Sequence, residues 1–226
     1  MNKLKKYKLI IFDWDGTLMD SQARIVSCLR FSQEKMNLKE KNETELKNII
    51  GLGLNEAIQT LYPDLNDEKV ETFAEAYRQC YLNAGHKPLN LFDQVEDLLA
   101  QLKQTGVMLA IATGKARRGL EHALNDVGLK SFFHASRCAD ETLSKPHPQM
   151  LEELLDEFAL LPQDAIMVGD TEYDLVMAKS INMDAIAVSY GVHDKERLLS
   201  CQPLACMANV EELASYLKVV AKNYMD

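Results

Sequence analysis

The stretch "IIFDWDGTLMDS", residues 10–21, places two carboxylates directly after a short apolar run. The run from Lys8 to Phe12 is bounded by charge, which is typical of a strand that is buried on both faces of a parallel sheet. In an open parallel sheet, ligands bind in the crevice beyond the carboxyl ends of the strands. We therefore expect Asp13 and Asp15 to lie at the mouth of such a crevice, outside the hydrophobic core.

The rest of the chain alternates helical and strand-like patterns. Apolar residues recur at i, i+3, i+4 and i+7 in three segments, and this spacing predicts helices at 95–102, 120–127 and 151–158. Short apolar runs predict strands at 107–114, 131–137, 165–170 and 184–191. The alternation predicts right-handed β-α-β units, and hence an α/β fold with a Rossmann-like, doubly wound parallel sheet.

The region from about Ser21 to Leu89 interrupts this alternation, because it contains helical patterns and no convincing strand. Its strongest predicted helices are 21–36, with Ser21 as the N-cap, and 66–85. We interpret the region as an all-helical cap inserted after the first strand, and we interpret Trp14 as packing against it. The predicted division is a core of residues 1–19 and 89–226 and a cap of residues 20–88.

Composition and charge narrow the class of protein. Of the 226 residues, 47% are hydrophobic, which suits one domain with a modest insertion. No apolar stretch has the length of a membrane span or the pattern of a signal peptide, so we expect a cytoplasmic protein with no membrane partner. A net charge of −9 opposes nucleic-acid binding. The five scattered cysteines lack metal-site spacing, and we interpret them as reduced thiols.

Acidic side chains follow the first and fourth predicted strands of the sheet. Asp13 and Asp15 follow the first, and Asp170 and Asp174 follow the strand at 165–170. Asp13, Asp15 and Asp170 would repel one another if they met at one edge of the sheet, unless a cation lay among them. A site built from oxygen ligands with few protein groups suits Mg²⁺, so the sequence implies a magnesium site.

A hydroxyl and an ammonium group also follow predicted strands. Thr113 ends the strand at 107–114, and Lys145 lies in the loop after the strand at 131–137. A metal ion, a lysine and a threonine together form a positively charged cradle, whose natural ligand is a phosphoryl group.

Four segments of the chain resemble the four motifs of the haloacid dehalogenase-like hydrolases. "DWDGTLMD" at 13–20 is similar to the first motif, Thr113 to the second, Lys145 to the third and "GDTEYD" at 169–174 to the fourth. They occur in the family's order over nearly the whole chain. The inserted helices resemble the family's helical cap, and the pattern is most similar to phosphoglycolate phosphatase-like and β-phosphoglucomutase-like members.

The resemblance implies a role for each acidic residue. Asp13 would be the nucleophile that forms an aspartyl-phosphate. Asp15 would be the general acid that protonates the leaving alcohol and then deprotonates a water molecule. Mg²⁺ would be bound by the Asp13 carboxylate, the Asp15 backbone carbonyl and Asp170, with Asp174 in contact with the ion or behind its ligands.

The resemblance also implies a phosphate-binding set and a reaction. Thr113 and Gly114 would bind the phosphoryl oxygens, and Lys145 would neutralise charge on Asp13 and the phosphate. Asp15 argues for phosphate-ester chemistry, because members that cleave carbon–halogen or phosphonate bonds do not need this acid. The expected activity is a phosphatase acting on a small phosphorylated metabolite, with phosphoglycolate as the leading substrate.

Two other functions remain open. A β-phosphoglucomutase-like phosphomutase shares these residues, but its relatives carry a histidine where this chain has Ile25, so hydrolysis is favoured over transfer. A signalling domain with a stable phospho-aspartate also combines acids, a hydroxyl and a lysine around Mg²⁺. Such domains are shorter, lack a helical insertion and carry the acceptor on a later strand.

Substrate identity is expected to depend on the cap. Candidates for meeting a second anionic group are Lys47, Arg78, His86 and Lys87, although an exposed helix face is the favoured interpretation for each. The segment "GLGL" at 51–54 is a candidate for lying over the substrate. The oligomeric state does not follow from the sequence.

Overall fold

A six-stranded parallel sheet organises the chain in the computed structural model, which describes residues 5–83 and 90–225. Across the sheet, the strands are β5 (Ala135–Cys138), β4 (Met108–Thr113), β1 (Leu9–Phe12), β6 (Ala165–Gly169), β7 (Asp184–Val188) and β8 (Ala205–Met207). The predicted α/β class and parallel Rossmann-like sheet are confirmed.

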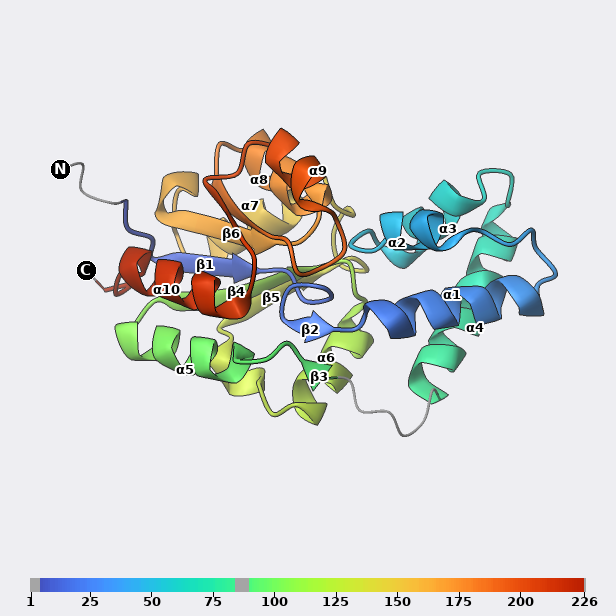
Figure 1. Cartoon of the computed structure of the whole chain (residues 1–226), viewed down its shortest axis with the longest axis horizontal. Coiled ribbons are helices and arrows are strands. Elements are labelled where there is room, and N and C mark those ends of the chain that lie inside the picture. Colours follow the sequence, from blue (N-terminus) through green and yellow to red (C-terminus); the bar gives the residue numbers. More distant parts are fainter. Residues whose placement is uncertain (1–4, 84–89, 226) are drawn as a thin grey trace.

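Helices cover both faces of the sheet (Figure 1). Ile10 and Phe12 of β1 belong to the hydrophobic cluster under α5 (Val95–Thr105), α6 (Arg117–Asp126) and α10 (Val210–Val220). Leu9 and Ile11 point the other way, into the cluster under α7 (Gln149–Glu157), α8 (Glu172–Ser180) and α9 (Lys195–Ser200). Alternate side chains of a strand face opposite sides, so a central strand between two helix layers must be apolar throughout.

The strand order places β1 between β4 and β6, at the point where the chain changes direction across the sheet. Phe12 is level with Ile111 of β4 and with Val168 of β6. The three strands therefore end at nearly the same height, and the residues that follow them meet. This is the switch point at which doubly wound sheets bind ligands.

Four helices form a separate group beside the sheet (Figure 1). They are α1 (Gln22–Lys35), α2 (Glu43–Asn48), α3 (Leu54–Leu61) and α4 (Asp67–Asn83). Their apolar faces bury a hydrophobic cluster of their own, with Leu29, Ile58 and Phe73 among its members. A two-stranded antiparallel ribbon, β2 (Met19–Asp20) paired with β3 (Asn90–Leu91), joins the two ends of this helical segment.

Two parts of the sheet differ from the sequence prediction. The predicted strand at 131–137 starts later: a 3₁₀ turn, η1 (Lys130–Phe132), precedes β5, and Phe132 and Phe133 pack against the core from the end of the sheet. Strand β8 was not predicted, because a three-residue edge strand with one neighbour leaves little pattern in the sequence. A second 3₁₀ turn, η2 (Pro162–Asp164), leads into β6.

Trp14 packs in the sheet domain, so its predicted packing against the inserted helices is wrong. The side chain is fully buried in the cluster under α5, α6 and α10. Its ring contacts the edge of Phe133, with the ring centroids 6.4 Å apart. Because successive side chains point in opposite directions as β1 ends, Trp14 turns into the core while Asp13 and Asp15 face the crevice.

The interpretation of all five cysteines as reduced thiols is also wrong. Cys28 on α1 and Cys80 on α4 form a disulfide with a Cα–Cα distance of 5.5 Å. Cys138, Cys201 and Cys206 are free thiols. The pair is separated by 52 positions, so only the packing of α1 against α4 brings the two residues together.

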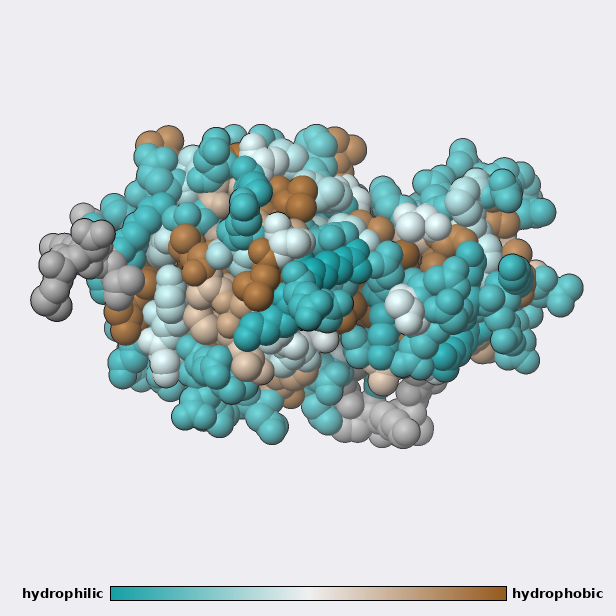
Figure 2. Space-filling view, turned by 45° about the horizontal axis from the view of Figure 1, so that its top comes forward, coloured by the Kyte–Doolittle hydropathy of each residue, from teal (hydrophilic) through white to brown (hydrophobic). Residues whose placement is uncertain are grey.

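Figure 2 shows hydrophilic side chains over most of one face, with hydrophobic ones in scattered groups. Among the described residues, no helix has the length and apolar character required to cross a membrane.

Candidate active site

Three carboxylates meet at the carboxyl ends of β1 and β6. Asp13 follows β1, Asp170 follows β6, and Asp174 lies in the first turn of α8. Each offers an oxygen within 4.8 Å of the other two, and all three residues are almost completely buried. Because like charges this close repel strongly, the cluster requires cations.

Lys145 supplies one of these cations. Its Nζ donates to Asp13 Oδ1 and to Asp174 Oδ1, both at 2.6 Å, and its side chain is completely buried. Burial disfavours the ammonium, but attraction to the two carboxylates outweighs it, so the pKa of Lys145 is raised. A permanently charged lysine therefore bridges the residues after β1 and the start of α8.

Asp170 is fixed by a side-chain and a backbone hydrogen bond. Oδ1 accepts a hydrogen bond from Thr17 Oγ1 at 3.0 Å, and Oδ2 accepts one from the Val192 amide at 2.8 Å. Gly16 has a φ of +91°, and a Cβ at this position would lie 2.2 Å from Asp170 Oδ2. Only glycine permits this close approach of the first motif to Asp170.

The carboxylate of Asp15 belongs to a different set of contacts. Oδ1 accepts from Ser21 Oγ at 2.6 Å, and Oδ2 lies 3.0 Å from Lys115 Nζ. The three carboxylates that cluster are therefore Asp13, Asp170 and Asp174. The sequence instead predicted a cluster that contains Asp15 in place of Asp174. Ser21 is the N-cap residue of α1, as the sequence predicts, but its side chain donates to Asp15 and makes no capping hydrogen bond.

Two acids of the cluster have raised pKa values. Burial raises the pKa of Asp13 well above its usual range, and attraction to Lys145 only partly opposes this. Burial and the charge of Asp174 raise the pKa of Asp170 to about 7. No described residue donates a hydrogen bond to Asp13 Oδ2, although that oxygen is buried. An unpartnered oxygen among three carboxylates fits a divalent metal ion bound to oxygen ligands.

Thr113 and Gly114 lie beside this cluster, at the end of β4. Thr113 is buried, and its Oγ1 accepts a hydrogen bond from the Lys115 amide at 3.1 Å. A Cβ on Gly114 would lie 2.5 Å from the carbonyl oxygens of Gly51 and Leu52. The helical segment therefore contacts the crevice directly at Gly114, where a larger residue would not fit.

Further hydrogen bonds hold the loop after α2 against the sheet domain. The Gly53 amide donates to Ser144 Oγ at 2.7 Å, next to Lys145. Tyr173 Oη, in α8, donates to the Asn48 carbonyl at 2.7 Å. The segment 51–54 thus lies at the boundary between the helical group and the residues that follow β4, β5 and β6.

The other predicted cap residues do not contact this cluster. Lys47 pairs with Glu43 at 2.7 Å on an exposed face of α2, and Arg78 pairs with Glu71 at 2.6 Å on an exposed face of α4. Ile25 is buried in the hydrophobic cluster of the helical group. The remaining two candidates, at positions 86 and 87, lie outside the described residues.

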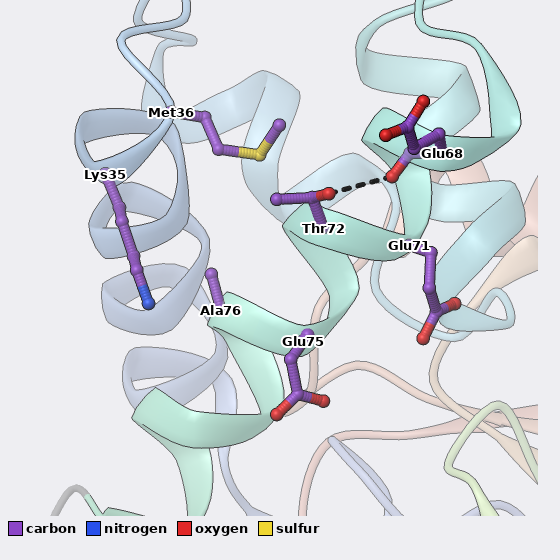
Figure 3. Close-up of a pocket in the computed structure, with 7 residues that line it drawn as sticks. All are labelled: Lys35, Met36, Glu68, Glu71, Thr72, Glu75 and Ala76. Carbon is purple, nitrogen blue, oxygen red and sulfur yellow. Dashed lines mark hydrogen bonds between the residues drawn. The ribbon is translucent and has the colours of Figure 1, made fainter.

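A cavity of about 650 Å³ lies elsewhere, between α1 and α4 (Figure 3). Its lining residues are Lys35, Met36, Glu68, Glu71, Thr72, Glu75 and Ala76. The three glutamates and the lysine of this lining are all exposed to solvent, unlike the buried side chains of the carboxylate cluster. None of the motif residues lines it, so the carboxylate cluster is the better candidate for an active site.

Comparison with known families agrees with this geometry. The family model described as "Haloacid dehalogenase-like hydrolase" matches residues 10–188, which include all four motifs. The chain is a haloacid dehalogenase-like hydrolase. The predicted resemblance is therefore confirmed.

This hydrolase is similar to proteins named as phosphatases. It is 31% identical to "Probable phosphatase IndB" of Dickeya dadantii over 95% of each chain. It is 27% identical to a phosphoglycolate phosphatase of Vibrio vulnificus, over 88% of this chain and 91% of that protein. A crystal structure of a predicted phosphatase from Clostridium acetobutylicum matches 94% of this chain and 99% of that one, with a TM-score of 0.84 and 27% identity. The predicted enzyme class, a phosphatase, is confirmed at the level of the family and its named relatives.

The raised pKa values predict that metal binding to the hydrolase competes with protons. In the metal-free protein, the Asp170 carboxyl stabilises the fold while it is protonated, and this contribution is lost as the pH rises through about 7. We expect Mg²⁺ to raise the melting temperature more at pH 8 than at pH 6, measured by calorimetry. The Asp170→Asn variant should lose most of this difference. An equal Mg²⁺ effect at both pH values would contradict the prediction.

The close contact at Gly114 predicts that a methyl group there will separate the helical segment from the crevice. In Gly114→Ala, we expect faster hydrogen exchange at the Gly53 amide, measured by NMR, because its bond to Ser144 depends on this contact. Gly128→Asn is the control, because Gly128 has a φ of +70° and a Cβ added there would meet no atom within 4 Å. Unchanged protection of Gly53 in Gly114→Ala would show that the contact does not hold the loop.

Proposed function

We propose that this protein is a Mg²⁺-dependent phosphomonoester hydrolase that acts on a small phosphorylated metabolite through an aspartyl-phosphate on Asp13. The observation that supports it is the state of the Asp13 carboxylate. Lys145 engages one of its oxygens, and the other oxygen is buried and has no hydrogen-bond donor among the described residues. A fixed carboxylate with one uncommitted oxygen suits nucleophilic attack.

In the first step, an oxygen of Asp13 attacks phosphorus as the bond from phosphorus to the alcohol oxygen breaks. The electron pair of that bond goes to the alcohol oxygen, and Asp15 donates a proton to it. In the second step, Asp15 takes a proton from water, and the water oxygen attacks phosphorus. The bond to Asp13 breaks, phosphate leaves, and both carboxyl groups return to their starting states.

The environments of the two aspartates differ. Asp13 lies among other carboxylates and contacts a lysine that also holds Asp174. Asp15 lies outside that cluster, between the hydroxyl of Ser21 and the ammonium of Lys115. Two carboxyl groups in one site can act as nucleophile and as acid only if their surroundings differ in this way.

The metal site is proposed on the same residues. Asp13 and Asp170 would hold Mg²⁺, together with the Asp15 backbone carbonyl that the family resemblance implies, and Asp174 would lie beside them. Bound there, the ion supplies positive charge that offsets the charge of the phosphoryl group. Lys145 adds a second positive charge, and Thr113 at the end of β4 is proposed to donate its hydroxyl to a phosphoryl oxygen.

Helices α1–α4 are proposed to act as a cap of residues 20–88 over a core of residues 1–19 and 89–226. The contacts of Gly53 with Ser144 and of Asn48 with Tyr173 support a closed arrangement, which excludes water from the crevice during the first step. Phosphoglycolate is the leading substrate because of the similarity to a phosphoglycolate phosphatase. Hydrolysis is favoured over a mutase reaction, because Ile25 is buried in the cap and offers no polar group to the crevice.

The Asp13→Asn variant tests the proposed nucleophile. We expect release of phosphate from phosphoglycolate and from p-nitrophenyl phosphate to fall by at least about 10³-fold, because the amide is a poor nucleophile. Phosphate release would be measured with and without Mg²⁺. The wild-type protein without Mg²⁺ should be comparably slow. Activity that survives Asp13→Asn would contradict the mechanism.

The Asp15→Asn variant tests the proposed acid separately. An alkyl phosphate has a poor leaving group that needs protonation, so kcat for alkyl phosphates should fall by about 10²-fold or more. The loss for p-nitrophenyl phosphate, whose leaving group is already a stable anion, should be smaller. Equal losses for both substrates, compared by kcat, would exclude Asp15 as the acid.

A further inference from the structure

A second buried lysine lies in the site, and the proposed mechanism leaves it without a role. Lys115 follows Thr113 by two residues, and its side chain is only 9% exposed. Nζ lies 3.0 Å from Asp15 Oδ2 and 3.2 Å from Tyr81 Oη, and it lies 4.5 Å from the centre of the Tyr81 ring. Lys115 therefore connects the proposed acid to helix α4 of the cap.

Two oxygen atoms lie against the ammonium of Lys115, Asp15 Oδ2 and Tyr81 Oη. Asp15 is the one carboxylate that pairs with it among the described residues. A buried ammonium that loses its counter-charge is strongly unfavourable.

The proposed reaction removes that counter-charge. Asp15 must carry a proton when it acts as the acid, and a protonated carboxyl is neutral. At that stage, Lys115 faces the alcohol side of the substrate with no anion beside it. An anionic group on the leaving alcohol would replace the lost charge of Asp15, whereas a neutral alcohol would not.

The surroundings of Lys115 favour the alcohol side as the place for such a group. Lys145 is committed to Asp13 and Asp174, on the side of the transferred phosphoryl group. Lys115 lies on the other side, between Asp15 and the cap. Arg24 of α1 lies on the same tyrosine, with its guanidinium 5.7 Å from the centre of the Tyr81 ring.

We propose that Lys115 determines substrate specificity by binding a carboxylate or another oxyanion on the leaving alcohol of the phosphoester. The inference rests on the proposed function, because it assigns an alcohol side to the crevice. The substrates are then small phosphomonoesters whose alcohol carries a second negative charge a few atoms from the ester oxygen. The short distance follows from the position of Lys115, which contacts the proposed acid itself.

The first test compares two substrates that differ in charge but hardly in size: phosphoglycolate and its carboxamide. For the wild type, kcat/KM should favour phosphoglycolate by about tenfold or more, since the amide cannot form the charged contact. In Lys115→Met, this preference should fall to within about threefold, while Lys115→Arg should keep part of it. Lys130→Met is the matched control, because Lys130 also pairs with a carboxylate, that of Glu121, but on the exposed surface. It should keep the full preference.

Equal losses for the two substrates in Lys115→Met would overturn the proposal, because Lys115 would then act only through Asp15. A wild type without preference for phosphoglycolate would also overturn it. p-Nitrophenyl phosphate, whose leaving group has no carboxylate, reports on the hydrolytic chemistry alone. A wild type that hydrolyses this ester in the presence of Mg²⁺ but does not discriminate by charge would therefore disprove the specificity and not the proposed function.

A second test needs no turnover. In the Asp13→Asn background, calorimetry would measure the binding of phosphoglycolate and of its carboxamide, with and without the added Lys115→Met change. The proposal predicts tighter binding of phosphoglycolate, and loss of that difference when Lys115 is replaced. If this difference is found but the wild type releases no phosphate from any ester, the specificity stands and the proposed function fails. If Asp13→Asn binds both compounds equally, the specificity is wrong.

Discussion

The burial of three carboxylates around one lysine is the constraint on which the site depends. Asp13, Asp170 and Asp174 come from three separate positions in the chain, and Lys145 holds two of them from a fourth. Such a group of like charges is stable only if cations balance it and the surrounding backbone fixes it. The parallel sheet provides this, because β1, β4 and β6 end side by side and deliver their following residues to one point.

Two buried lysines neutralise different carboxylates of the crevice. Lys145 pairs with carboxylates that are proposed to hold the metal and attack phosphorus. Lys115 pairs with Asp15 and lies against the cap. The two aspartates of the first motif, only two residues apart, therefore have different electrostatic surroundings. Alternation at the end of β1 turns Trp14 into the core and leaves both aspartates on the side of the crevice. The difference between the two aspartates comes from their neighbours, because Asp13 contacts Lys145 whereas Asp15 contacts Ser21 and Lys115.

Close backbone contacts connect the helical group to the crevice in the described part of the chain. Gly114 touches the carbonyl oxygens of Gly51 and Leu52, and the Gly53 amide reaches Ser144. The helical group has its own hydrophobic cluster and a disulfide between α1 and α4. Both features let it keep its shape apart from the sheet, as a group of helices needs to do if it closes over a substrate as a body.

The sequence by itself determined five strands of the parallel sheet, the helices at 95–102, 120–127 and 151–158, and the polar residues that follow the strands. Apolar periodicity decides these elements locally, and polar residues that directly follow buried strands must lie at the carboxyl edge of the sheet. It did not determine β8, whose three residues at the sheet edge leave little pattern, or the pairing of Cys28 with Cys80. The sequence also did not predict the partners of Lys115 and Ser21, although Lys115 lies only two residues after Thr113. Only the tertiary structure decided which carboxylates share a cluster, because such contacts join residues far apart in sequence and depend on how side chains turn at the ends of strands.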